Sequence, residues 1–341
     1  MSTQMRAAAV AAGLAAILLA AGGAVADITI ETVPVGNPGN AADTRYATPG
    51  YGAVSYEYNI GKYEVTAGQY TAFLNAVAAT DTYGLYNTSM WSNTYGCKIE
   101  RTGSSGSYTY SVAGDWANRP VNYVSFWDAC RFANWLHNGQ PTGLQGAGTT
   151  ERGAYTLDGY NGSDGRTIGR NTDWKWAITS EDEWYKAAYH KNDGVTGNYW
   201  DYPTSSNSTP SNDLINPDPG NNANFEQSGY TIGSPYYRTE VGEFENSESP
   251  YNTFDQGGNV WEWNETIVYE GEGWSSRGVR GGSFYYGGTL LLASYRNLIG
   301  DPANEYDGFG FRVSEVPEPG SMALLALGCV GLLRRRRNVR G

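Results

Sequence analysis

The stretch FDQGGNVWEW, residues 254–263, decides the fold predicted for this sequence. Two carboxylates, Asp255 and Glu262, lie on either side of a glycine-rich turn, and Trp261 and Trp263 close the stretch. Calcium is bound by hard oxygen ligands from acidic side chains and by carbonyls that irregular backbone leaves free. The stretch therefore predicts a structural calcium ion. In the alternative interpretation, the tryptophans belong to the core and the acids cap backbone N–H groups.

Around this stretch the sequence is rich in glycine and aromatic residues, and few segments have a helical period. It contains 45 Gly, 27 Tyr and 11 Trp in 341 residues. Helices are predicted after the capping patterns at Thr66 and Ser125, and from Thr179 or Ser180, because apolar residues recur there at helical spacing. Long polar stretches separate them, chiefly residues 93–116, 140–173 and 192–222. Since no internal repeat or domain linker is visible, one loop-rich domain is predicted.

Both ends of the chain carry targeting patterns. Residues 1–26 have a charged start, an Ala-rich apolar run and Ala-Val-Ala before Asp27, which is typical of a secretory signal peptide. The run is too short for a membrane anchor. Residues 317–341 read Pro-Glu-Pro, a short apolar run and then four arginines, so a transient membrane association is expected. The predicted mature domain therefore spans residues 27–316.

The C-terminal tail resembles the PEP-CTERM sorting signal of Gram-negative bacteria. The resemblance implies that an exosortase removes the tail while the protein is exported through the inner membrane. It implies a final location at the cell surface or in the extracellular polymer matrix.

The sequence is acidic, with a formal net charge of −12. A nucleic-acid partner is not expected, because phosphate binding needs a basic face. Cys97 and Cys130 are the cysteines of the predicted mature domain, and they either form a disulfide or are small core residues. The two histidines, His137 and His190, lie near predicted helix ends, and the sequence has no HExxH, P-loop or GxSxG motif. No catalytic pattern therefore stands out.

Six short motifs occur in a recognisable order. They are Gly61–Thr66 (GKYEVT), Arg119–Ala129 (RPVNYVSFWDA), Thr179–Trp184 (TSEDEW), Gly258–Trp263 (GNVWEW), Arg280–Ser283 (RGGS) and Gly308–Arg312 (GFGFR). This series resembles the formylglycine-generating, sulfatase-modifying-factor family over a core of residues 56–313. The resemblance implies an α+β, C-type-lectin-like fold with small twisted sheets and little regular secondary structure for its length.

The resemblance also implies which residues would bind calcium. In the family, the glycine-rich turn binds this ion through an acid or amide, two backbone carbonyls and a glutamate. These ligands correspond to Asp255, Gly258, Val260 and Glu262. A second family site corresponds to Asn224 and the carbonyl of Phe225, with no clear acidic partner in this sequence.

Copper is not expected. The family's enzymes oxidise a sulfatase cysteine with two copper-binding cysteines that follow the RGGS motif. The corresponding positions here are near Tyr286 and Leu291. Neither side chain supplies the thiolate that holds Cu(I), so the domain is predicted to lack this activity.

The segment between RGGS and GFGFR has the composition of a binding surface. It is rich in Tyr, Ser, Asn and Gly, which are typical of paratopes, and it resembles the ligand-binding face of retroelement-diversified proteins. The candidate ligand-binding residues are Tyr285, Tyr286, Tyr295, Arg296, Asn297 and Tyr306. The alternative is a simple aromatic core strand, and Leu290–Leu292 is expected to be one.

The predicted function is therefore a non-catalytic module that binds an extracellular polymer, a glycan or a protein. Two alternatives stay open at this point. One is a formylglycine-generating-type oxidase acting on sulfatase cysteine, and the other is a structural component of the extracellular matrix.

Overall fold

The computed structural model describes residues 27–317. The predicted signal peptide lies outside the described residues, as does the predicted sorting tail from residue 318 onward. Within residues 27–317, no helix is both long and apolar enough to cross a membrane.

The three predicted helices are confirmed, and each begins with a reciprocal capping box. They are α1 (Ala67–Val77), α3 (Phe126–His137) and α4 (Glu181–Tyr189). The N-cap of α4 is Ser180, whose hydroxyl accepts the Glu183 N–H while the Glu183 side chain accepts the Ser180 N–H. Both contacts satisfy backbone donors that a helix start leaves free. A fourth, short helix, α2 (Ser89–Ser92), immediately precedes the first long polar stretch.

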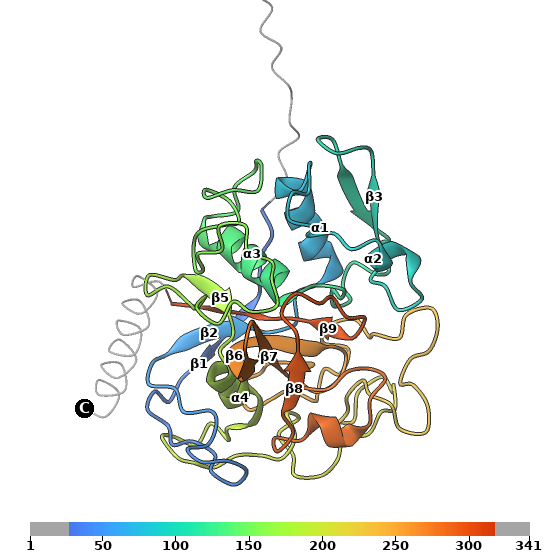
Figure 1. The fold of residues 1–341 in the computed structure, drawn as a ribbon. Helices are drawn as coiled ribbons and strands as arrows, with labels where there is room; N and C mark the ends of the chain where they lie inside the picture. The colour runs from blue at the N-terminus through green and yellow to red at the C-terminus, as the bar shows by residue number, and fades with distance from the viewer. Residues whose placement is uncertain (1–26, 318–341) are drawn as a thin grey trace, which may run out of the picture.

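The first sheet joins segments from both ends of the domain. Its order is β1 (Thr32–Val35), β2 (Tyr58–Gly61), β10 (Val313–Glu315) and β5 (Trp176–Ile178), with every pair antiparallel. β1 precedes the region that resembles the family, so the folded unit begins before residue 56. Figure 1 shows this sheet beside α3 and α4.

The second sheet carries the motifs that follow. Its order is β8 (Asn297–Gly300), β7 (Trp274–Arg280), β6 (Trp261–Gly271) and β9 (Phe309–Gly310). The GNVWEW motif thus leads into β6, and the RGGS motif begins at the last residue of β7. The GFGFR motif contains β9, which pairs with β6 in parallel. A separate hairpin consists of β3 (Ile99–Thr102) and β4 (Thr109–Val112).

Aromatic side chains fill the core between α1, α3 and the sheets. Trp261 and Trp263 are almost fully buried, which confirms that the tryptophans of the opening stretch are core residues. Phe132 of α3 contacts the rings of Phe73 and Phe311, with centroid distances of 5.3 Å in both cases. Large aromatic rings bury much apolar area per residue, which helps a chain with so little regular structure to form a stable core.

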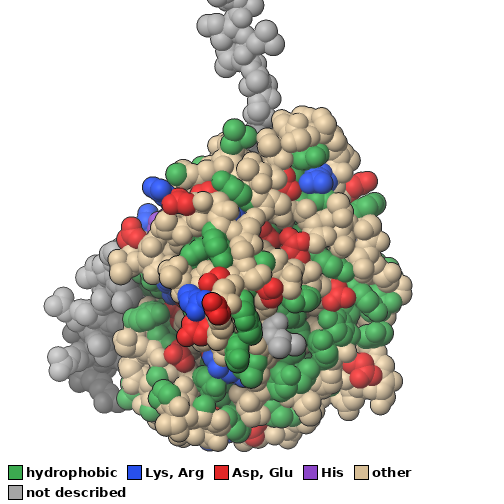
Figure 2. Space-filling view, in the orientation of Figure 1, with side chains coloured by type: hydrophobic (Ala, Val, Ile, Leu, Met, Phe, Trp, Pro, Cys, Tyr) green, Lys and Arg blue, Asp and Glu red, His purple; other side chains and the backbone are tan. Residues whose placement is uncertain are grey.

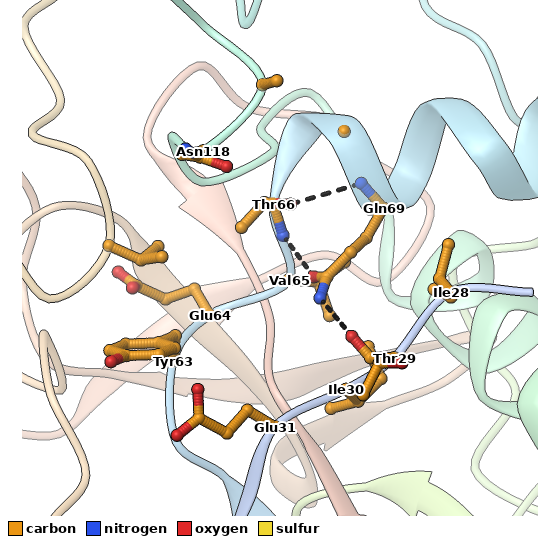
Figure 3. Close-up of a pocket in the computed structure, with 13 residues that line it drawn as sticks. Ile28, Thr29, Ile30, Glu31, Tyr63, Glu64, Val65, Thr66, Gln69 and Asn118 are labelled. Carbon is orange, nitrogen blue, oxygen red and sulfur yellow. Dashed lines mark hydrogen bonds between the residues drawn. The ribbon is translucent and has the colours of Figure 1, made fainter.

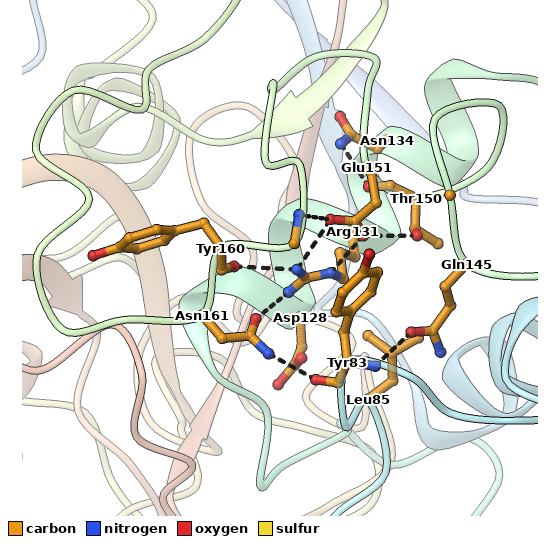
Figure 4. A network of polar contacts seen from close by, with 12 residues as sticks. Tyr83, Leu85, Asp128, Arg131, Asn134, Gln145, Thr150, Glu151, Tyr160 and Asn161 are labelled. Carbon is orange, nitrogen blue, oxygen red and sulfur yellow. Dashed lines mark hydrogen bonds and ion pairs between the residues drawn. The ribbon is translucent and has the colours of Figure 1, made fainter. Parts of the chain in front are cut away.

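A buried polar network ties the long stretch 140–173 to α3 (Figure 4). Arg131 of α3 is fully buried, and its Nε and Nη2 donate to the two Glu151 oxygens at 2.8 and 3.1 Å. The guanidinium also donates to the Asn161 side chain and the Tyr160 carbonyl. This stretch is therefore held by charge-assisted hydrogen bonds in place of strand pairing, which accounts for an unusually long loop.

The two histidines have structural surroundings. His190 is buried, and its ring nitrogens lie 2.8 Å from the Tyr251 hydroxyl and 3.2 Å from the Thr196 carbonyl. The His137 Nδ1 accepts the Lys175 N–H. Burial lowers the pKa of both rings, which favours neutral imidazoles with these fixed partners.

Candidate functional site

The RGGS turn needs its glycines. Gly281 and Gly282 have φ of +101° and +78°, and a Cβ on Gly281 would lie 2.6 Å from the Gln256 carbonyl oxygen. Only glycine adopts this backbone without strain, so the turn packs directly against the stretch that precedes β6. Arg280, at the end of β7, then reaches across the turn.

Glu181 clamps both ends of the segment that follows. Its Oε1 accepts hydrogen bonds from the Nε atoms of Arg280 and Arg296, both at 2.8 Å, and its Oε2 accepts one from Arg296 Nη2 at 2.6 Å. Arg280 Nη1 also donates to the Tyr295 carbonyl at 2.7 Å. The side chain of Glu181 is only 5% exposed. The segment from Arg280 to Arg296 is therefore a loop with both ends fixed at one buried carboxylate.

Two tyrosines of this loop form an exposed aromatic face over a buried tryptophan. The Tyr286 and Tyr295 rings each lie 5.8 Å from the Trp261 ring. They are 39% and 36% exposed, whereas Trp261 is buried. We refer to Trp261, Tyr286 and Tyr295 as the aromatic face. Rigid rings in fixed positions offer contact area at a low cost in conformational entropy.

The other four candidate ligand-binding residues make contacts within the domain or belong to a strand. The Tyr285 hydroxyl donates to Asp307 at 2.9 Å, and Arg296 is held by Glu181. Tyr306 packs on Phe309 with a ring distance of 4.7 Å. Asn297 belongs to β8. The six predicted residues thus separate into two that are exposed together and four with structural positions.

The prediction of a strand at Leu290–Leu292 is wrong. Gly288–Leu291 forms a 3-10 helix, because the Leu290 N–H bonds the Gly287 carbonyl three residues before it. Leu291 is fully buried in a cluster with Tyr202 and Phe225, so its apolar character serves burial and not strand pairing. The position that corresponds to the second copper-binding cysteine is therefore part of the core.

The cysteines of the described residues are Cys97 and Cys130. Both are free and fully buried, so the disulfide does not form and both are small core residues. Burial raises the pKa of both thiols. A protonated, inaccessible thiol is a poor metal ligand and a poor nucleophile.

The oxygen atoms expected to bind calcium at the glycine-rich turn only partly match a calcium site. Both oxygens of Glu262 accept from Arg312, at 2.6 and 2.7 Å, and Oε2 also accepts from Trp184 Nε1 at 2.8 Å. Glu262 and Arg312 are fully buried, so this carboxylate has the partners it requires. Asn224 forms a bridge with Gly258, and its Oδ1 has no hydrogen-bond partner among the described residues. The Phe225 carbonyl accepts from Asn212 and Thr231.

Glu64 is a buried carboxylate that was not among the predicted site residues, although it belongs to the GKYEVT motif. Its side chain lines a cavity between residues 28–31, 63–69 and 117–118 (Figure 3). It is 2% exposed, and neither oxygen has a hydrogen-bond partner within residues 27–317. Burial, followed by the charges of Asp255 and Glu262, raises the pKa of Glu64 well above its usual range. The motif alone could not reveal that this carboxylate would be buried without a donor.

Two hydrogen-bonded carboxyl groups, those of Asp128 and Glu305, hold the loop before GFGFR. The Asn87 amide donates to Glu305. Asp128 also accepts from the Ser125 N–H and hydroxyl, at 2.9 and 2.6 Å. Burial and the Asp128 charge raise the pKa of Glu305 to about 8. Near neutral pH the pair is therefore expected to retain one proton.

This pair predicts a stability that falls as the pH rises. The pKa of Glu305 rises from 4.5 in the unfolded chain to about 8 in the folded protein. The stabilisation by the proton of the pair is therefore fully present below pH 4.5 and is lost as the pH rises through 8. Glu305→Gln removes the titration and keeps the Asn87 contact. The loss of unfolding free energy between pH 5 and pH 8 is expected to be smaller in this variant, by on the order of 2 kcal/mol.

Urea denaturation at both pH values measures this difference. Glu270→Gln, at an exposed position of the β6–β7 hairpin, is the control and should retain the dependence of the unmodified protein. An equal dependence in Glu305→Gln would show that the pair does not share a proton.

Family models match almost the whole chain. A model described as the sulfatase-modifying factor enzyme 1-like domain matches residues 15–315, and the PEP-CTERM protein-sorting motif matches residues 315–337. The sorting motif marks the protein for recognition by an exosortase and for export across the inner membrane to the cell surface or extracellular space. No curated protein matches the sequence significantly.

The chain is also similar to solved structures at low sequence identity. The crystal structure of CarF is 17% identical, with a TM-score of 0.50 over 85% of this chain and 99% of CarF. Variable protein 1 of Treponema denticola is 18% identical, with a TM-score of 0.49 over 84% of this chain and 95% of that protein. PvdO of Pseudomonas aeruginosa is also 18% identical, with a TM-score of 0.44 over 84% and 94%.

The structure has an α+β, C-type-lectin-like fold, as the motifs implied. With the fold, the motif order and the family match in agreement, the chain belongs to the sulfatase-modifying factor enzyme 1-like domain family.

Proposed function

We propose that this exported domain is a non-catalytic binding module whose aromatic face holds an extracellular polymer, a glycan or a protein. The supporting observation is the position of Tyr286 and Tyr295, which are more than one-third exposed while they rest on the buried Trp261. Sugar rings and protein side chains both pack on such fixed aromatic surfaces. The loop that carries them is held at both ends by Glu181, so little ordering is required on binding.

The proposal that the module does not catalyse rests on the residues at the copper-binding positions. Tyr286 and Leu291 lie where the resemblance places the cysteines, and Leu291 is buried. Cys97 and Cys130 are buried as thiols. Copper-dependent oxidation of a Cys-X-Pro-X-Arg peptide by the purified protein would contradict this part of the proposal. We also propose that the tail associates with the membrane only until the exosortase removes it.

Tyr286→Ala is expected to weaken ligand binding by at least tenfold, because a well-packed interface tyrosine contributes about 2 kcal/mol or more. A glycan and matrix-polymer array should first identify a ligand for the unmodified protein, and titration should then give the affinity of the variant. Because Glu181 fixes both ends of the loop, the substitution is expected to remove the Tyr286 ring without displacing the rest of the loop.

Tyr269→Ala is the matched control. Tyr269 is 54% exposed and stacks on Trp274 in the β6–β7 hairpin, outside the aromatic face. This variant should bind like the unmodified protein. If Tyr286→Ala and Tyr269→Ala bind equally well, the aromatic face is not the binding site. If no array component binds, a structural role in the matrix is favoured.

A further inference from the structure

The aromatic face continues into tyrosines from two other segments of the chain. The centroid of the Tyr286 ring lies 4.5 Å from that of Tyr285, which lies 6.3 Å from that of Tyr95. The Tyr95 ring lies 4.8 Å from the Tyr237 ring, and the Tyr237 ring lies 5.2 Å from the Tyr230 ring. We refer to these five tyrosines as the aromatic row. The row shares Tyr286 with the aromatic face and therefore extends it.

The added part of the row lies at the surface over a buried ring. Tyr230 is 43% exposed, and Tyr95 is half-buried. Phe284 is fully buried, and its ring lies 5.5 Å from the Tyr95 ring and 6.5 Å from the Tyr230 ring. Phe284 therefore supports this part of the row as Trp261 supports the aromatic face. Figure 2 shows hydrophobic side chains, a class that includes tyrosine there, gathered to the right of the place of β8 in Figure 1.

Hydrogen bonds fix the two added segments to the domain. The Tyr95 carbonyl accepts from Nη1 of the fully buried Arg238 at 2.6 Å. The Glu226 N–H donates to the Tyr286 carbonyl at 2.9 Å, which ties the segment that carries Tyr230 to the loop after RGGS. Since both segments are already held in place, binding across the row requires little ordering of the protein.

The chemistry of the row favours an uncharged ligand with many hydroxyl groups. Tyrosine offers an apolar ring and a hydroxyl, so it contacts both the C–H surfaces and the hydroxyls of a sugar. The protein has a net charge of −12, and the Asp307 carboxylate accepts from the Tyr285 hydroxyl at 2.9 Å. Arg296, the cation that follows Tyr295, is paired with Glu181. An anionic polymer would therefore be repelled.

We infer that the aromatic row binds a neutral polysaccharide in an extended conformation. Consecutive sugar units lie on successive tyrosine rings, as consecutive bases lie on aromatic side chains in proteins that bind single strands. The small central anchor of a protein partner would contact only part of the row. The inference rests on the proposed function, because the polysaccharide also covers the aromatic face. It adds the class of ligand and the further contacts at Tyr95 and Tyr230.

The experiment titrates the purified protein with neutral hexasaccharides of glucose, mannose and galactose, with the matching disaccharides, and with alginate as an anionic polymer. At least one hexasaccharide should bind about tenfold more tightly than its disaccharide, because it contacts further rings, and alginate should not bind. Tyr230→Ala should weaken hexasaccharide binding about fivefold, because one stacked ring is removed. Its disaccharide affinity should stay within about twofold, since Tyr230 lies outside the aromatic face. Tyr286→Ala should weaken the binding of both sugars.

Tyr269→Ala is again the matched control and should bind both sugars like the unmodified protein. If Tyr286→Ala weakens hexasaccharide binding and Tyr230→Ala does not, the inference is overturned while the proposed function stands. If neither variant weakens binding, the proposed function fails as well. The inference is also overturned if alginate or a protein binds and no neutral hexasaccharide does. Should Tyr230→Ala fail to fold, Tyr95→Ala decides by the same criterion.

Discussion

Arg312→Met is expected to lower the free energy of unfolding by about 3–5 kcal/mol, which is the usual cost of removing one partner from a buried ion pair. Arg312 is fully buried, and it donates two hydrogen bonds to Glu262 and others to the Gly61 and Phe254 carbonyls. Methionine fills a similar length but leaves the Glu262 charge uncompensated. The loss should appear as a lower urea midpoint with an unchanged slope.

A second substitution separates the charge from the packing. In Arg312→Met with Glu262→Gln, the orphaned charge is removed and the amide oxygen can still accept from Trp184 Nε1. The double variant should therefore be more stable than Arg312→Met alone. Arg152→Met is the control, because the Arg152–Asp158 pair is 61% and 51% exposed, and exposed pairs contribute little to stability. A loss in Arg312→Met no larger than in Arg152→Met would contradict the assigned role.

The local features of the fold could be predicted from the sequence. The capping patterns at Thr66, Ser125 and Ser180 involve residues three apart, so the helix starts follow from short-range chemistry. The sheets could not be predicted in this way. Ile60 pairs with both Val33 and Ser314, which come from opposite ends of the domain, and strands of three or four residues carry almost no periodic signal. Their pairing is set by the tertiary structure.

The candidate site was predictable only in outline. The motif order indicated that the loop after RGGS would be important, and the composition indicated binding. Which tyrosines are exposed depends on what lies beneath them, and Trp261 supports Tyr286 and Tyr295 but not Tyr306. For Glu64, the sequence shows a carboxylate but not the absence of donors around it. Burial and partners at long range are properties of the folded chain.

Glu181→Gln is expected to destabilise the protein by about 3 kcal/mol and to weaken binding at the aromatic face, although Glu181 does not belong to that face. Glu181 is the carboxylate that Arg280 and Arg296 share, and it follows the N-cap of α4. The amide of glutamine keeps the shape but cannot neutralise two guanidinium groups. Both ends of the loop would lose a charge-assisted contact.

Whether Glu181→Gln loses ligand binding before it unfolds shows whether Glu181 positions the aromatic face or only stabilises the fold. Arg280 also holds the Tyr295 carbonyl, so a loosened Arg280 should change the position of Tyr295 before the domain unfolds. Ligand binding should therefore weaken at least tenfold under conditions in which the variant is fully folded by circular dichroism. Glu272→Gln, with the same charge change at an exposed position between β6 and β7, should alter neither quantity. Normal affinity in a folded Glu181→Gln variant would show that the clamp supports the fold but does not position the aromatic face.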